Sequence, residues 1–295
     1  MPSRIAGALP NSLALGLESG EIPCMVNLDG CGPELAAAAE RRTGCIVEAL
    51  SALDDQALLA PSVLRGWSRL TIACHLRYGA DALSRMTVAA LEGVPVAYYP
   101  GGRDQQRPAS LEPKPDEASR DVVASLANRS DHLDQLWSGL SDVQWSLDVV
   151  EPDDNPDLGL LPLVRLPLLR LTEVEVHGSD LGIGLDDWSD LFVRVALPFR
   201  LDWLTTRRTN HRGFDDQLEG SWLLVATDGP AYVVTVMGTT VESHPSSRAL
   251  PARAAIEATT RDLLALLLGR PPQHRLCYSG DRDFGRAFSR AFPGP

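Results

Sequence analysis

The chain has 295 residues, of which 44% are hydrophobic and 22% are charged, and its formal net charge is -12. This composition is typical of a globular protein with one large or two modest domains. The acidic balance argues against nucleic-acid binding and against anionic membranes, because like charges repel each other. The longest apolar run, residues 263–268, is far shorter than the roughly 20 apolar residues that cross a bilayer.

The cysteines and the N-terminal sequence indicate the compartment. Five cysteines are present and no two of them form a CxxC pair. An odd number without such a pair argues against a disulfide framework and against a cysteine-rich zinc site. Residues 1–21 hold no continuous apolar core before a small-residue cleavage site, so we expect no signal peptide. These features predict a cytoplasmic protein.

Apolar residues at helical spacing predict the first two helices. The first begins near Pro33, after residues 1–30, which show no regular period and are expected to form a loose leader. Ser68 is expected to cap the second helix, which runs through His75 to about Gly93, where glycine favours an end.

Loops and further helices follow in the middle of the chain. Segments 94–107 and 151–159 are expected to be loops, because the first is rich in glycine and the second in proline and acidic residues. Helices are expected over residues 113–140, 167–182 and 188–205. The second of these starts with a proline, which is accepted in a first helical turn.

The pattern changes to short β-prone runs near the C-terminus. Residues 222–226 and 231–236 are two such runs, and the Asp228-Gly229 pair between them favours a hairpin. Residues 252–268 are strongly apolar and are predicted to form one helix that ends at Gly269.

These elements predict two domains and an α+β fold. We expect the leader over residues 1–30, a helical bundle over residues 31–212 and a small α/β domain over residues 213–295. No internal repeat is present in the sequence.

The strongest functional signal is a histidine on one predicted helix and an acid–histidine pair on another. Glu173 and His177 stand at positions i and i+4, so both point from one face of a helix. With His75 they offer two imidazoles and a carboxylate, which leaves a fourth position open, as in a catalytic zinc site. Glu175 is expected to face solvent, because it points about 200° away from Glu173 around the helix.

Each of these residues also has a purely structural interpretation. A histidine among apolar residues, such as His75, is more often a hydrogen-bonded core residue than a metal ligand. Glu173 and His177 alone would make a surface pair worth only about 0.3–0.5 kcal/mol. Asp180, one turn after His177, either orients that imidazole or is a surface acid near the helix end. Cys74 is expected to be a core residue rather than a nucleophile.

Several segments together resemble a known family. They are GWSR at 66–69, ACHL at 73–76, YPGGRD at 99–104, RLTEVEVH at 170–177 and DLG at 180–182. With these segments the chain resembles the mycothiol-dependent maleylpyruvate isomerase family, over most of residues 33–290. The resemblance implies a DinB-like metal-binding four-helix bundle, followed by a small sterol-carrier-protein-like α/β domain.

The resemblance also implies a cofactor, a co-substrate and binding residues. It implies that zinc is held by His75 and by the acid–histidine pair, with an open position for the thiolate of mycothiol. It implies further that Arg103 and an arginine of the C-terminal tail bind an anionic substrate. Arg282 and Arg286 are the candidates for this second arginine.

We therefore predict a zinc-dependent enzyme that uses mycothiol. S-transfer or thiol exchange on an electrophilic small molecule, in detoxification or secondary metabolism, is the preferred reaction, because the leader, the acidic loop and the tail depart from the family pattern. The alternatives are a cis–trans isomerase of the maleylpyruvate type, a metal-dependent hydrolase and a non-catalytic small-molecule binding protein. Nickel or iron would also suit these ligands. The expected partners are a small electrophile and a low-molecular-weight thiol, without nucleic acid or membrane, and the expected state is a monomer or small homo-oligomer.

Overall fold

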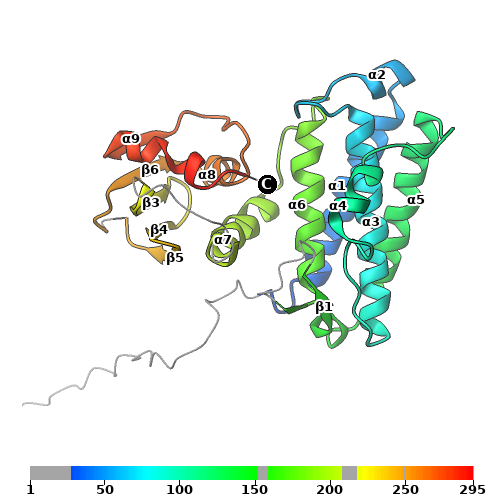
Figure 1. Ribbon diagram of the computed structural model, residues 1–295, viewed down its shortest axis with the longest axis horizontal. Helices are drawn as coiled ribbons and strands as arrows, with labels where there is room; N and C mark the ends of the chain where they lie inside the picture. The colour runs from blue at the N-terminus through cyan, green and yellow to red at the C-terminus, as the bar shows by residue number, and fades with distance from the viewer. Residues whose placement is uncertain (1–27, 152–158, 208–217, 249, 295) are drawn as a thin grey trace, which may run out of the picture.

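The computed structural model describes residues 28–151, 159–207, 218–248 and 250–294. A helical part is followed by a part built on a five-stranded sheet, so the predicted α+β class is confirmed. In Figure 1 the long helices lie on one side of the molecule and the sheet lies on the other. The predicted domain boundary at residue 212 falls outside the described residues, as does most of the predicted leader.

Four long helices form the bundle: α1 (Gly32–Ser51), α3 (Arg69–Leu91), α5 (Ser119–Ser138) and α6 (Arg165–Asp180). α1 and α3 each pack against both α5 and α6, so the four helices enclose one core. The start of α3 is as predicted, because the hydroxyl oxygen of Ser68 accepts a hydrogen bond from the backbone N–H of Thr71. This cap fixes the first turn of the helix that carries His75.

The bundle helices are joined by short elements, which are α2 (Asp55–Leu59), α4 (Arg103–Ser110), a 3-10 turn (Gln144–Ser146), β1 (Asp148–Val150) and β2 (Leu160–Pro162). α4 shows that the predicted loop over residues 94–107 is wrong in its last part. Gly102, at a φ of 91°, redirects the chain so that a helix begins at Arg103. This helix is short and polar, so it has no apolar period that a sequence analysis could detect.

The third predicted helix begins at Ser119, later than the expected start near residue 113. Asp116 adopts a left-handed conformation with a φ of 63°. The Glu117 carboxylate accepts a hydrogen bond from the N–H of Lys114 and pairs with Arg77. These contacts close a turn where the sequence suggested a helix with acidic residues in its first turn.

The second part of the chain begins with α7 (Asp190–Arg207). Its sheet has the order β5-β4-β3-β6-β7, in which β3 and β6 are parallel and the other neighbours are antiparallel. The first three strands in sequence are β3 (Gly220–Ala226), β4 (Ala231–Met237) and β5 (Thr240–Ser246). β3 and β4 pair through Trp222 and Val234, which confirms the predicted hairpin.

The predicted helix over residues 252–268 is wrong in its first half. β6 (Ala254–Ala258) lies beside β3, and only then does Thr259 cap α8 (Thr260–Leu267). Residues 254, 256 and 258 are buried and alternate with more exposed ones, which is the period of a strand. The chain ends with β7 (Cys277–Gly280), α9 (Arg282–Arg286) and α10 (Phe288–Ala291).

One hydrophobic cluster extends through both parts of the chain. α7 packs against α6 of the bundle and against α8 and β5 of the second part, so it joins the two. Among the residues that the structure describes, no helix has the length and apolar character needed to cross a membrane.

Glu175 corrects one sequence prediction, because it is buried rather than exposed to solvent. Its side chain is 2% exposed and forms an ion pair of 3.1 Å with Arg42 of α1. It also accepts hydrogen bonds from the backbone N–H and the hydroxyl group of Ser189. The helix face opposite Glu173 therefore packs against α1 and the segment before α7. The buried carboxylate of Glu175 needs a charged partner there.

We expect Glu175→Leu to lower the free energy of unfolding by about 3 kcal/mol, because it leaves the largely buried Arg42 without its carboxylate. Urea denaturation followed by circular dichroism measures the change. Glu242→Leu, at an exposed position of β5, serves as the control. The double variant Arg42→Met with Glu175→Leu should recover most of the loss, and equal losses in the single and double variants would contradict this account.

Candidate active site

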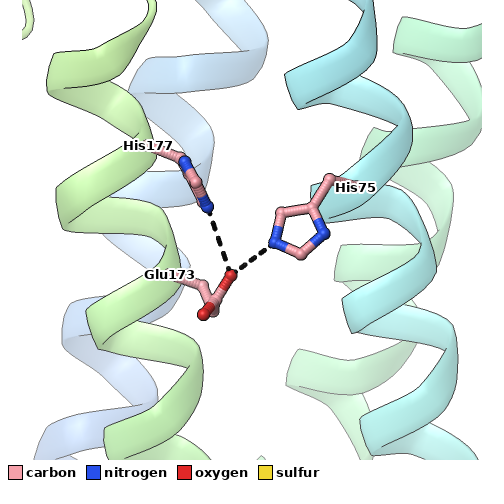
Figure 2. A group of neighbouring side chains, drawn as sticks. All are labelled: His75, Glu173 and His177. Carbon is pink, nitrogen blue, oxygen red and sulfur yellow. Dashed lines mark hydrogen bonds and ion pairs between the residues drawn. The ribbon is translucent and has the colours of Figure 1, made fainter. Parts of the chain in front are cut away.

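Two helices of the bundle bring three polar side chains together. His75 projects from α3, and Glu173 and His177 project from consecutive turns of α6, as Figure 2 shows. Nε2 of His75 lies 2.6 Å from Oε2 of Glu173, and Nε2 of His177 lies 3.5 Å from the same oxygen. One ligand atom from each residue lies within 4.8 Å of the others, so the three could hold a single metal ion.

The electrostatics of the cluster favour an ionised Glu173. Burial disfavours its charge, but the hydrogen bonds from His177 and His75 outweigh burial and hold the pKa of Glu173 well below its usual value. For His75, burial dominates and lowers the pKa of the imidazole. For His177, burial acts in the same direction but is outweighed by hydrogen bonds to Asp180 and Glu173, which raise its pKa to about 9.

Asp180 connects His177 to the second part of the chain. Its Oδ2 lies 2.9 Å from Nδ1 of His177, which leaves Nε2 directed at Glu173. Both carboxylate oxygens of Asp180 accept hydrogen bonds of 2.8 Å from Arg270, which follows α8. Asp180 is only 2% exposed, so it lies at the helix end but is not a surface acid. Its position therefore depends on both parts of the chain.

Trp67 packs against both imidazoles from the segment before α3. Its ring stacks on His177 with 5.9 Å between centroids and meets His75 edge-on at 5.5 Å. These contacts limit rotation of the two rings. Trp67 belongs to the GWSR segment, but nothing in the sequence indicates this role at the site.

The cluster opens into a cavity of about 600 Å³ between α6 and α7. Among the described residues, two carboxylates, Glu151 and Glu173, line it. Its walls also carry six arginines, which are Arg65, Arg103, Arg107, Arg165, Arg200 and Arg270. The cavity is therefore cationic although the whole chain is acidic, and it suits an anionic ligand.

Comparison with known proteins agrees with this geometry. Residues 38–182 match the family model described as the mycothiol maleylpyruvate isomerase N-terminal domain. This span contains the whole cluster of His75, Glu173 and His177. Residues 38–182 therefore form a domain of this family.

Two solved structures also resemble the chain. They are the crystal structures of the mycothiol-dependent maleylpyruvate isomerase and of a histidine-to-alanine mutant of it. Each aligns with a TM-score of 0.61 and 18% identity over 84% of this chain and 92% of its own. The alignment shows a common fold through both parts of the molecule. A comparison with curated proteins found no match.

The structure places the arginines that the family resemblance suggested in different surroundings. Arg103 lines the cavity, where its guanidinium lies 6.0 Å from the ring centre of Tyr99. Arg282 and Arg286 do not line the cavity, because both are exposed on α9, where Arg286 pairs with Asp283. The second part of the chain brings two other arginines to the cavity, Arg200 from α7 and Arg270 from the segment after α8. No sequence signal distinguishes Arg270 beyond its position after Gly269, the glycine that follows the end of α8.

Cys74 precedes His75 but does not join the cluster. The side chain is buried, and burial raises the pKa of its thiol to about 11. Such a thiol is protonated at neutral pH, so it is a poor nucleophile. This agrees with the expectation that Cys74 is a core residue.

We expect alkylation to separate the cysteines of the native protein. Iodoacetamide at neutral pH should modify the exposed Cys45 and Cys277 at least tenfold faster than Cys74, because the thiolate of Cys74 is scarce and inaccessible. Peptide mass spectrometry over a time course measures the rates. The same reaction in urea should remove the difference, and rapid labelling of Cys74 in the native protein would contradict the structure.

Proposed function

We propose that this protein is a mycothiol-dependent isomerase that acts on an unsaturated acid and uses a divalent metal ion at His75, Glu173 and His177. The observation that carries the proposal is the convergence of these three donors in a cationic cavity, within a domain of the mycothiol maleylpyruvate isomerase family. The two solved relatives are named as a mycothiol-dependent isomerase and its mutant. Their names favour isomerisation over S-transfer, the reaction predicted from the sequence.

The donor set fits a divalent ion. Two imidazole nitrogens and one carboxylate oxygen are ligands that zinc commonly takes, and three protein ligands leave one position for a substrate atom. The hydrogen bond between His177 and Asp180 is of the kind that orients metal-bound histidines. The same donors suit nickel or iron, so zinc is the preferred metal and metal analysis is part of the test.

A divalent ion in this cluster would lower the pKa of a thiol and keep it as a thiolate at neutral pH. The protein's own residues would then position the acid. Arg107 lies 5.9 Å from the ring centre of Trp67, which contacts both imidazoles, so its guanidinium lies near the cluster. Arg103 and Arg107 both lie on α4, and together their guanidinium groups can donate paired hydrogen bonds to a carboxylate.

The chemistry of isomerisation balances without any other reactant. The thiolate sulfur adds to one carbon of a double bond conjugated to a carbonyl group, and the electron pair of the π bond moves to the carbonyl oxygen. The former double bond is now single and rotates. The electron pair then returns, the C–S bond breaks, and the trans alkene and the thiolate are released. The arginines would stabilise the negative charge on the oxygen, because it develops beside fixed cations.

We expect His177→Ala and Glu173→Gln each to lose the bound metal and to reduce mycothiol-dependent isomerisation of maleylpyruvate at least 100-fold. Elemental analysis of the purified protein and the change in substrate absorbance measure the two effects. His132→Ala, at an exposed position of α5, is the matched control and should keep both metal and activity.

The outcomes separate the alternatives. A wild-type protein without bound metal, or a Glu173→Gln variant with full activity, would overturn the proposal. Accumulation of a mycothiol conjugate in place of the trans acid would indicate S-transfer. Turnover without any thiol would indicate a metal-dependent hydrolase.

Asp180 gives a second test of the metal centre. We expect Asp180→Asn to weaken metal binding about 10–100-fold, because the amide no longer fixes the orientation and charge of His177. Competition with a chromogenic chelator measures the dissociation constant independently of activity. Asp148→Asn, at an exposed position of β1, is the control. An unchanged metal affinity in Asp180→Asn would show that Asp180 only holds Arg270.

A further inference from the structure

The cavity follows one face of α6 for most of its length. The residues of this helix that line it recur at helical spacing, and they are Arg165, Leu169, Thr172, Glu173, Val176 and His177. Arg165 precedes Glu173 by eight residues, which corresponds to about 12 Å along the helix axis. The cavity therefore has two ends, with the polar cluster at one end and Arg165 at the other.

Arg165 differs from the other buried charges of α6. The residue is 7% exposed, and its Nε atom is buried without a hydrogen-bond partner. Among the described residues, no carboxylate lies within ion-pair distance of its guanidinium, whose clearest contact is the ring of Phe199 at 5.4 Å. Burial lowers its pKa, and the charge of the nearby Asp202 offsets only part of this effect. A charged group in this state is costly unless a ligand completes its hydrogen bonds.

Apolar side chains line part of the wall between the two ends. Leu161 of β2, Leu169 of α6 and Phe199 of α7 line this stretch of the cavity. A ligand that reaches from Arg165 to the cluster must therefore present an apolar middle to these side chains and an anionic group to the guanidinium.

We propose that Arg165 binds an anionic group at the far end of the substrate, so that the preferred substrate is an elongated diacid with an apolar middle rather than a short one. This inference rests on the proposed function, which concerns the reacting end of the substrate. It adds the chemical class of the group at the other end, which is an anion. In this arrangement Arg103 and Arg107 would engage the carboxylate next to the reacting double bond, and Arg165 would engage a second carboxylate at the other end of the cavity.

Calorimetric titration with saturated α,ω-dicarboxylates, from succinate to sebacate, tests the inference on the full-length protein. We expect affinity to rise with chain length and to level off once the two carboxylates can span the cavity. Arg165→Met should weaken binding of the longest acid about tenfold and leave succinate unchanged, because only the long acid reaches this position. Arg165→Lys should retain part of the length preference. Arg194→Met, at an exposed position of α7, should match wild type.

The stability of the variant shows whether a loss of affinity is specific. Arg165→Met should keep or raise the unfolding midpoint, since it removes a buried cation without a close partner. A wild-type series without length dependence, or an equal loss for short and long acids in Arg165→Met, would overturn the inference. So would a selective loss of mycothiol affinity, which would place the thiol at this end.

The proposed function and the proposed role of Arg165 can be overturned separately. Retained length preference without mycothiol-dependent turnover would overturn the proposed function and leave Arg165 as an anion-binding residue. Mycothiol-dependent turnover without length preference would overturn only the role of Arg165.

Discussion

The contact between the Glu173 carboxylate and two imidazoles, inside a helical bundle, is the constraint on which the rest of the site depends. The Glu173 carboxylate is only partly exposed, and it is stable only where partners offset the loss of its hydration. One partner, His177, is provided by α6 itself. The other, His75, comes from α3, so the two helices must pack at a fixed register. Two residues before His177, Glu175 is paired with Arg42 of α1 on the opposite face. α6 is therefore held from both sides by charged pairs, and its rotation and height in the bundle are set by them as well as by apolar packing.

The end of α6 extends this constraint to the second part of the chain. Asp180 accepts hydrogen bonds from Arg270, and the same carboxylate is hydrogen-bonded to His177. A shift of α8 and the segment after it would thus reach an imidazole of the cluster through one buried carboxylate. α7 and Arg270 also form walls of the cavity. The bundle alone positions the three side chains, and the second part of the chain forms part of the wall around them, which reduces their contact with water and strengthens the charge–charge interactions there.

The sequence predicted the features of this site that depend on local spacing. The positions of Glu173 and His177 imply one helix face, and the hydroxyl of Ser68 implies the start of α3. The sequence-based predictions were wrong where contacts between residues far apart in the sequence determine the structure. Glu175 was expected to face solvent because helical geometry gives the angle between two side chains but not what packs on the opposite face. Residues 252–268 form a strand and a helix because β3 offers an edge to residues 254–258, and no local signal reveals that edge. Arg270 reaches Asp180 across 90 residues of sequence, so no spacing rule could select it over Arg282 or Arg286.

The distribution of charge explains how an acidic protein can select an anionic ligand. The net charge of -12 repels anions at long range, but that repulsion is screened within about 8–10 Å at physiological ionic strength. Among the described residues, six arginines and two carboxylates line the cavity, so positive charge predominates there. Walls of low dielectric constant focus the electric field of these charges. Binding is therefore expected to depend on short-range contacts, not on attraction to the surface. To make such contacts, a ligand must fit the shape of the cavity and carry an anionic group. An anion that does not fit cannot reach the arginines and is repelled by the acidic surface. A cavity of this kind discriminates among acids by their length and by the positions of their charges, which is a stricter selection than charge alone can give.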